Sequence, residues 1–152
     1  MSDDLPPTRG LTASVHDCTC NNLRKAARAV TQYYDEALRP SGIRATQFSL
    51  LSAIKQFGTV SIGALAEESV MDRTTLTRNL KLLEDEGLIT VMPGADARVR
   101  EVSLTPVAHE KLAVAHRYWK KAQTHMADAM GADRVRRLLR DLSGAVEAAR
   151  AD

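Results

Sequence analysis

The feature that most constrains the fold is a pair of helical patterns separated by a very short turn, in the stretch SIGALAEESVMDRTTLTRNLKLLEDEGLI at 61–89. The spacing predicts a short helix from about Ser61 to Glu68, a turn of about three or four residues, and a longer helix at 72–86. Asp72 can cap the longer helix, because its carboxylate can accept hydrogen bonds from the first free N–H groups. Two helices joined so tightly predict a helix-turn-helix.

A hairpin follows directly after this pair of helices. The segment LITVMPGADARVREVSLT contains two short β-rich runs, at about 88–92 and 99–104, around a Pro-Gly-Ala-Asp turn. Glycine, proline and aspartate between β-rich runs are typical of hairpin turns. We therefore expect the hairpin to form the wing of a winged helix-turn-helix.

Helical spacing also precedes this central region. Apolar residues recur every three or four positions from about 15 to 38, at Cys20, Leu23, Ala27, Val30, Tyr34 and Leu38. A second helix opens near Thr46 and closes at Gly58. We expect both of these helices to be largely core.

Two more helices are predicted towards the end of the chain. Thr105 can cap the first of them, Pro106 suits its first position, and it extends to about Met130. Gly131 then breaks the pattern, and Asp133 is expected to cap the last helix. The apolar side of that last helix consists of Val135, Leu138, Leu139, Leu142, Ala145, Val146 and Ala149.

The expected fold class is mainly α with a small β-hairpin wing. One domain is expected at 15–152, with a winged helix-turn-helix at about 46–104 and dimerisation helices at about 15–38 and 105–150. Residues 1–14, which include two prolines and a glycine, are expected to form a flexible arm.

The terminal helices carry more apolar surface than the winged lobe between them can cover. Helices of roughly 25 and 18 residues extend about 27 to 38 Å at 1.5 Å per residue, too far to pack wholly on a lobe of about 75 residues. A two-fold partner would bury the excess and would match a palindromic DNA site. We therefore expect a homodimer, with a monomer as the alternative.

Length and charge exclude several classes of protein. A chain of 152 residues has material for one domain with a real core. Its net charge is only +2, so nucleic-acid binding would need locally clustered charge and not a polycationic tail. No stretch approaches the roughly 20 apolar residues of a membrane span, and the N-terminal residues are acidic and polar where a signal peptide is basic and then apolar. A cytoplasmic protein with reduced cysteines and no membrane partner is expected.

The two sides of the predicted helix at 72–86 differ in chemistry. At about 100° per residue, one side holds the leucines Leu76, Leu80 and Leu83. The opposite side contains no acid and holds Thr74, Thr77, Arg78 and Lys81. This helix is therefore expected to bury its leucines and to present the polar side to a partner.

That polar side suits the major groove of B-DNA. Arginine can bind guanine through two hydrogen bonds, threonine can donate to phosphate or meet a thymine methyl group, and lysine neutralises backbone charge. Arg73 and Thr75 lie at the helix start, the end that usually reaches base edges. Arg98 and Arg100, in and after the hairpin turn, would lie beside the neighbouring minor groove. The pattern predicts sequence-specific binding of double-stranded DNA.

Other classes of protein fit the same residues less well. A polar helix face can be merely solvated, but the tight turn before the helix and the hairpin after it favour DNA binding. A winged helix that acts as a protein-interaction module would usually expose apolar or acidic residues where this chain exposes basic ones. An enzyme would need a convergent nucleophile, acid or metal set, and none is apparent. We expect no catalytic activity, no cofactor and no metal.

The segments LAEESVMDRTTLTRNLKLLEDEGLI and GADARVREVSLTPVAHEKL resemble the helix-turn-helix, and the wing with the next long helix, of MarR-type transcriptional regulators. The similarity runs from about Cys18 to the end of the chain. It implies a homodimer whose first and last helices intertwine, two winged lobes in successive major grooves, and usually repression of a nearby promoter. Asp96 and Arg98 match the family's wing pair, in which the acid orients the arginine, whereas Ala97 stands where a second arginine is common.

The resemblance leaves two ways of switching DNA binding open. The commoner one in the family is a small aromatic or amphipathic effector that binds between the dimer helices and the winged lobe. The other is a thiol-based redox sensor, because Cys20 and Tyr34 are similar in placement to the reactive cysteine and one supporting tyrosine of the family's organic-hydroperoxide sensors, with Phe48 in place of the second tyrosine. Cys18 is predicted some 200° from Cys20 around the helix, so a bond between these two cysteines is not expected.

Overall fold

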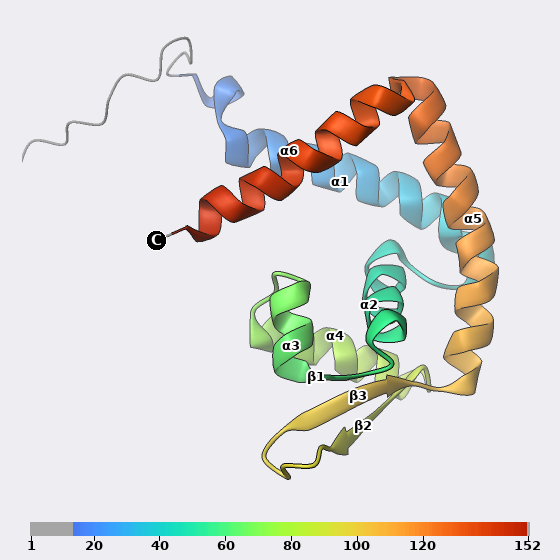
Figure 1. Ribbon diagram of the computed structural model, residues 1–152. Coiled ribbons are helices and arrows are strands. Elements are labelled where there is room, and N and C mark those ends of the chain that lie inside the picture. Colours follow the sequence, from blue (N-terminus) through green and yellow to red (C-terminus); the bar gives the residue numbers. More distant parts are fainter. Residues whose placement is uncertain (1–13, 152) are drawn as a thin grey trace, which may run out of the picture. The chain divides into compact units, whose positions relative to one another are not determined.

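The computed structural model describes residues 14–151 (Figure 1). The described chain divides within α1, Thr19–Leu38, into two compact units. The first unit contains a short 3-10 helix, Val15–Asp17, and most of α1, and the second contains the end of α1 and every later element. The expected flexible arm at 1–14 lies almost wholly outside the described residues.

The second unit continues through six helical and three β elements after α1. A 3-10 turn, Arg39–Ser41, leads into α2, Ala45–Phe57, which is followed by β1, Thr59–Ser61, α3, Ile62–Glu68, α4, Arg73–Asp85, β2, Ile89–Pro93, β3, Arg100–Leu104, α5, Pro106–Met130, and α6, Ala132–Arg150. This order confirms the expected fold class, mainly helical with a small β wing. No helix within residues 14–151 combines the length and the apolar character that crossing a bilayer requires.

The strands form one antiparallel sheet in the order β1-β3-β2. β2 and β3 are the predicted hairpin, in which Val91 lies opposite Val102, and β1 pairs with the other edge of β3, where Val60 lies opposite Val102. The sequence pattern does not predict β1, because three residues are too few to show an alternation of period two. β1 ties the wing to the helix-turn-helix, since its last residue, Ser61, also caps α3 by accepting the N–H of Ala64 at 3.1 Å.

The hydrophobic core joins α2, α3 and α4 to the sheet and to the first half of α5. Its members include Leu50, Leu51, Ile54, Leu65, Leu76, Leu83, Leu88, Val102 and Leu112, together with Leu38 and Ile43 from the chain before α2. The expectation that α2 is largely core is confirmed, since Leu50, Leu51 and Ile54 are buried. The same expectation for α1 is wrong for a single chain, because Leu38 is the one buried residue among the described positions of this helix. Periodicity identifies the apolar side of a helix but not the surface that covers it.

The end of α4 is a hydrogen-bonded turn centred on a glycine. The N–H groups of Gly87 and Leu88 donate to the carbonyls of Glu84 and Leu83, each at 2.9 Å. This pair of bonds is a Schellman motif, which places one residue in the left-handed region, and Gly87 occupies that position with φ of 69°. The motif turns the chain sharply from α4 into β2.

The end of α3 is built in the same way but carries a valine at the left-handed position. The N–H groups of Val70 and Met71 donate to the carbonyls of Glu67 and Ala66 at 3.2 and 3.0 Å. Val70 has φ of 51° and is the one residue other than glycine with a positive φ in the described part of the chain. A β-branched side chain is strained there, and it gains little from packing because Val70 is exposed. This strained residue forms the turn of the helix-turn-helix.

The helices α5 and α6 begin in different ways. Thr105 caps α5 as predicted, since its hydroxyl oxygen accepts the N–H of Ala108 at 3.2 Å. The predicted cap of α6 is wrong: Gly131, with φ of 88°, occupies the cap position, and Asp133 lies inside the first turn, where it pairs with Arg136. The carboxylate of Asp133 then acts on the positive end of the helix by its charge. No described residue of α6 is buried.

Candidate nucleic-acid interface

The predicted recognition helix is α4, and Asp72 fixes its start. One carboxylate oxygen of Asp72 accepts the N–H of Thr75 at 2.8 Å, and the other accepts the hydroxyl of Thr75 at 2.6 Å. These hydrogen bonds, that of the hydroxyl first, hold the pKa of Asp72 below its ordinary value of 3.8. The predicted cap is therefore present. Because the hydroxyl of Thr75 donates its proton to the cap, that proton is not free to bind another partner.

The polar side of α4 is exposed along its whole length. Every residue that the sequence assigns to DNA on this helix is exposed, namely Arg73, Thr74, Thr75, Thr77, Arg78 and Lys81. The three leucines of the other side are buried, as expected. The expectation that the polar side holds no acid is wrong at its last turn, where Asp85 pairs with Lys81 and its hydrogen bond raises the pKa of that lysine. A spacing of four residues between opposite charges is the signal that could have found this pair.

Arg73 lies over the start of α3. A Cβ atom built on Gly63 would stand 3.3 Å from Nη2 of Arg73, which is tighter than an ordinary contact. Gly63 therefore leaves the space in which this guanidinium sits. The sequence places Arg73 at the helix start, and the structure adds that its side chain reaches back across the helix-turn-helix.

The wing turn is ordered by Asp96 through the main chain. Oδ1 of Asp96 accepts the backbone N–H of Arg98 at 3.0 Å, and its carbonyl accepts the N–H of Val99 at 2.9 Å. The N–H of Gly94 closes the turn on the carbonyl of Val99 at 2.7 Å. The acid thus holds Arg98 by its backbone, and the side chains of Arg98 and Arg100 are exposed.

Glu101 adds an acid to the wing that sequence reasoning does not assign. A Cβ atom on Gly94 would lie 2.9 Å from Oε1 of Glu101, so the absence of a side chain at Gly94 leaves room for this carboxylate. Glu101 lies opposite Met92 in the hairpin register. The wing therefore presents two arginines with a carboxylate close to its turn.

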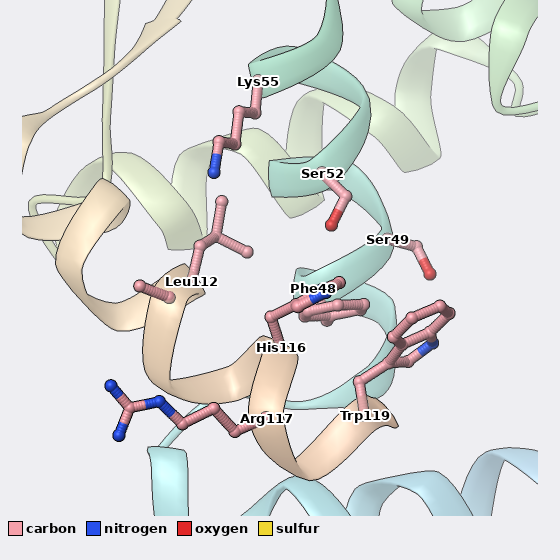
Figure 2. Close-up of a pocket in the computed structure, with 9 residues that line it drawn as sticks. Phe48, Ser49, Ser52, Lys55, Leu112, His116, Arg117 and Trp119 are labelled. Carbon is pink, nitrogen blue, oxygen red and sulfur yellow. The ribbon is translucent and has the colours of Figure 1, made fainter. Parts of the chain in front are cut away.

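A cavity of about 820 Å³ lies between α2 and α5. Figure 2 shows Phe48, His116 and Trp119 grouped along one wall of it. The rings of Phe48 and Trp119 are stacked at 5.9 Å between centroids, and those of His116 and Trp119 at 5.2 Å. Lys55 and Arg117 supply positive charge at its lining. Nothing local in the sequence brings these residues together, because they come from helices about 60 positions apart.

The two residues of the predicted thiol sensor do not meet within this chain. Cys20 is an exposed free thiol in the first turn of α1, and Tyr34 lies fourteen positions later, about 21 Å at 1.5 Å per residue. The hydroxyl of Tyr34 donates to the side-chain carbonyl of Gln123 on α5. Cys18 is also an exposed free thiol and precedes α1, so an argument from its angle around the helix does not apply. Within the described residues, no group of three or more His, Cys, Asp or Glu side chains could hold a metal ion.

The arrangement of α3, α4 and the wing is that of a winged helix-turn-helix, and comparison with known proteins agrees. The family model described as the MarR family matches residues 43–99. The chain is 41% identical to the M. tuberculosis transcriptional regulator MosR in its crystal structure with DNA, with a TM-score of 0.78 over 88% of this chain and 99% of that one. The chain belongs to the MarR family of transcriptional regulators, which are DNA-binding proteins and not enzymes.

Two more distant proteins are similar to this chain, one in its fold and the other in its sequence. A crystal structure of a mutant MarR from E. coli in complex with operator DNA is 23% identical, with a TM-score of 0.75 over 83% of this chain and 91% of that chain. An uncharacterised HTH-type transcriptional regulator of Bacillus subtilis (strain 168), YwoH, is 28% identical over 91 residues, which are 60% of this chain and 66% of that protein. The aligned part thus spans just under two thirds of that curated relative.

Proposed function

We propose that this chain is a cytoplasmic repressor that binds a palindromic double-stranded operator as a homodimer and is released by a small-molecule effector. The observation that carries the proposal is the exposed, mainly basic side of α4, with Arg73, Arg78 and Lys81, together with the exposed wing arginines Arg98 and Arg100. The MosR structure, at 41% identity, contains DNA, which supports the same partner here.

In this proposal the polar residues divide into two groups by position. The residues of α4 enter the major groove, where Arg78 and the threonines Thr74 and Thr77 read base edges and Lys81 binds the backbone once it leaves Asp85. The wing arginines lie in the minor groove, and Asp96 sets the turn that presents them. Arg73 and the methyl group of Thr75 complete the contacts at the helix start.

The homodimer is supported by apolar residues that the single chain leaves exposed. Helix α1 exposes Leu23 and Val30, and helix α6 exposes Leu138, Leu139, Leu142 and Val146. Exposed apolar residues gathered on one side of a helix mark an interaction surface. We assign the segments at about 15–38 and 105–150 to dimerisation and that at about 46–104 to the winged lobe, and a two-fold dimer of such lobes requires a palindromic site.

The effector is proposed to occupy the cavity between α2 and α5. Its aromatic wall of Phe48, His116 and Trp119 suits a small aromatic or amphipathic molecule, and the charges of Lys55 and Arg117 favour an acidic group on it. Because α2 also packs in the core of the winged lobe, occupation of the cavity can bias the position of that lobe. Release from DNA requires only that the effector bind more tightly to the arrangement of the two lobes that does not bind DNA.

A redox switch at Cys20 is the second candidate. The observation that favours it is that the Cys20 thiol is exposed in the single chain and so can be reached by a peroxide. In this switch, the tyrosine that supports the Cys20 thiol would have to be Tyr34 of the partner subunit, since Cys20 and Tyr34 of one chain are about 21 Å apart along α1. The test is Cys20→Ser, which should keep operator affinity and lose any release by cumene hydroperoxide. Release of that variant by the peroxide would exclude the switch.

The main test is selection of bound fragments from genomic DNA, followed by gel shift on the recovered site at fixed salt. We expect an inverted repeat to bind at least about a thousandfold more tightly than a scrambled duplex, with an affinity that falls steeply as salt rises. Equal affinity for both duplexes would contradict the proposal and would favour a protein-interaction module on the same fold. The genes beside the recovered sites would indicate the effector.

A further inference from the structure

Gln47, in the first turn of α2, joins that helix to the end of the recognition helix. Its Nε2 atom lies 3.1 Å from each carboxylate oxygen of Glu86, which is the residue that ends α4. Its Oε1 atom accepts the backbone N–H of Arg44 at 3.0 Å. Both ends of the amide are therefore bonded, and this fixes the direction in which Gln47 holds Glu86.

The turn of α2 that carries Gln47 is itself held by the end of α1. Oδ1 of Asp35 accepts the N–H of Ala45, the first residue of α2, at 2.7 Å. The residue before it, Arg44, has no side-chain oxygen that could cap the helix, so Asp35 takes that role from another helix. Its negative charge also suits the positive end of α2. The support for Gln47 thus extends back to α1.

The far end of α4 is positioned by directional contacts. Thr105 donates its hydroxyl to the carbonyl of Gly87 at 2.7 Å, and Gln47 binds Glu86 from α2. Asp72 fixes the start of the helix, and its three leucines pack into the core. Apolar packing is not directional, whereas a hydrogen bond restricts both distance and angle. Side chains that read base edges must be held to within about 0.5 Å, so a small rotation of α4 about its leucines would misplace Thr77 and Arg78 together.

We propose that Gln47 is a positioning residue for sequence-specific DNA recognition. By holding Glu86 it sets the angle at which α4 enters the major groove, and it touches no DNA itself. This inference rests on the proposed operator binding by α4, and it adds a residue outside the helix-turn-helix and the wing to the determinants of specificity.

Three variants separate the hydrogen bond from the charge. Gln47→Met keeps the length and the charge of the side chain but removes both of its hydrogen bonds. Gln47→Glu places a second carboxylate against Glu86. Adding Glu86→Gln to Gln47→Glu exchanges donor and acceptor, because the amide at position 86 can then donate to the carboxylate at position 47, which still accepts the N–H of Arg44.

The deciding measurement is the ratio of operator affinity to affinity for a scrambled duplex, by fluorescence anisotropy at fixed salt with the active fraction titrated. We expect the ratio to fall about threefold to tenfold in Gln47→Met and Gln47→Glu, and to return to within about twofold of the wild type in the exchanged pair. The matched control is Gln56→Glu, which makes the same change from amide to carboxylate at an exposed position near the other end of α2. It should weaken both affinities alike and leave the ratio unchanged, because phosphate attraction carries no sequence information.

The proposal is overturned if the wild-type chain prefers its operator and both variants at Gln47 keep the full ratio. It is also overturned if the exchanged pair stays as low as Gln47→Glu. A wild-type chain with no preference for any operator would instead refute the proposed function, so the two failures are distinct. Circular dichroism and thermal unfolding check each fold, and if Gln47→Met does not fold, the comparison of Gln47→Glu with the exchanged pair still decides.

Discussion

Helices α4 and α6 carry similar apolar stripes and differ in what covers them. The leucines of the 13-residue α4, Leu76, Leu80 and Leu83, are 0%, 3% and 1% exposed. The 19-residue α6 leaves its stripe open, with exposures of 41%, 54%, 36% and 41% at Leu138, Leu139, Leu142 and Val146. The winged lobe therefore closes its own core, whereas no other described residue covers the apolar side of α6.

The polar sides of the two helices differ as well. The basic residues of α6 are interleaved with acids, as in the pair Asp133 and Arg136, whereas α4 exposes threonines, arginines and a lysine until Asp85 in its last turn. A polar side that holds both acids and bases is typical of a solvated helix, whereas a polar side with an excess of bases attracts an anion. The comparison supports the proposals that α4 contacts DNA and that α6 contacts a second copy of the chain.

The largest expected effect is the loss of a buried leucine. Leu76→Ala should lower the free energy of unfolding by about 2 to 5 kcal/mol, because it removes buried methyl groups and leaves a cavity. Leu139→Ala, measured at a concentration too low for association, should lower it by less than about 1 kcal/mol. Urea unfolding measures both, and equal losses would contradict the difference in burial between the two helices.

The next effect concerns association. The double variant Leu138→Asp with Leu142→Asp should be a folded monomer by sedimentation equilibrium, because charges on the open stripe oppose burial. Its operator affinity should fall about a hundredfold, since the two lobes no longer bind as one unit. The melting temperature of the wild-type chain should rise with protein concentration, and that of the double variant should not. A double variant that still dimerises would remove α6 from the interface.

A smaller effect separates the polar sides. Arg78→Ala should weaken operator binding by about 1 to 3 kcal/mol and should change the sequence preference, because a base contact is lost. Arg136→Ala, on α6, removes one partner of an exposed ion pair and should leave operator affinity within about 0.5 kcal/mol of the wild type. Gel shift at one salt concentration tests both. Equal effects would mean that arginine acts here only through overall charge.

The smallest expected effect is a pH dependence at the start of α4. The pKa of Asp72 is lowered in the folded chain, so its contribution to stability is present above its ordinary value of 3.8 and is lost as pH falls below that value. Asp72→Asn keeps a good capping side chain that does not titrate in this range. The stability difference between wild type and Asp72→Asn should therefore change as pH falls below about 3.8. Parallel acid-unfolding curves would contradict a role for the ionised cap.

Local features of the fold could be predicted from the sequence. Asp72 and Thr105 were assignable as caps because an N-cap depends on residues within one turn, and the buried leucines of α4 followed from helical period. Asp133 does not cap α6, because Gly131 occupies the cap position and leaves Asp133 inside the first turn. The pairing of Lys81 with Asp85 is also local, since opposite charges four positions apart in a helix are neighbours.

Features that depend on distant parts of the chain could not be predicted. β1 exists because β3 offers an unpaired edge, and its three residues show no pattern of their own. The bond between Gln47 and Glu86 joins positions 39 apart, and the stack of Phe48, Trp119 and His116 joins two helices. The expected burial of α1 is wrong within one chain. Helical periodicity identifies the apolar side of a helix, but it does not identify the surface against which that side packs.

The left-handed valine at the end of α3 has a consequence for how this protein can adapt. Its partner motif at the end of α4 uses Gly87, so the same geometry is reached in this chain both with and without the steric penalty of about 1 to 2 kcal/mol. Valine and glycine codons differ at a single nucleotide, so one point mutation, Val70→Gly, can remove the steric penalty. The net gain in stability is smaller than this penalty, because glycine loses more backbone entropy on folding. In a lineage that moves to a hotter habitat, a single nucleotide change at this position can therefore raise the stability of the protein.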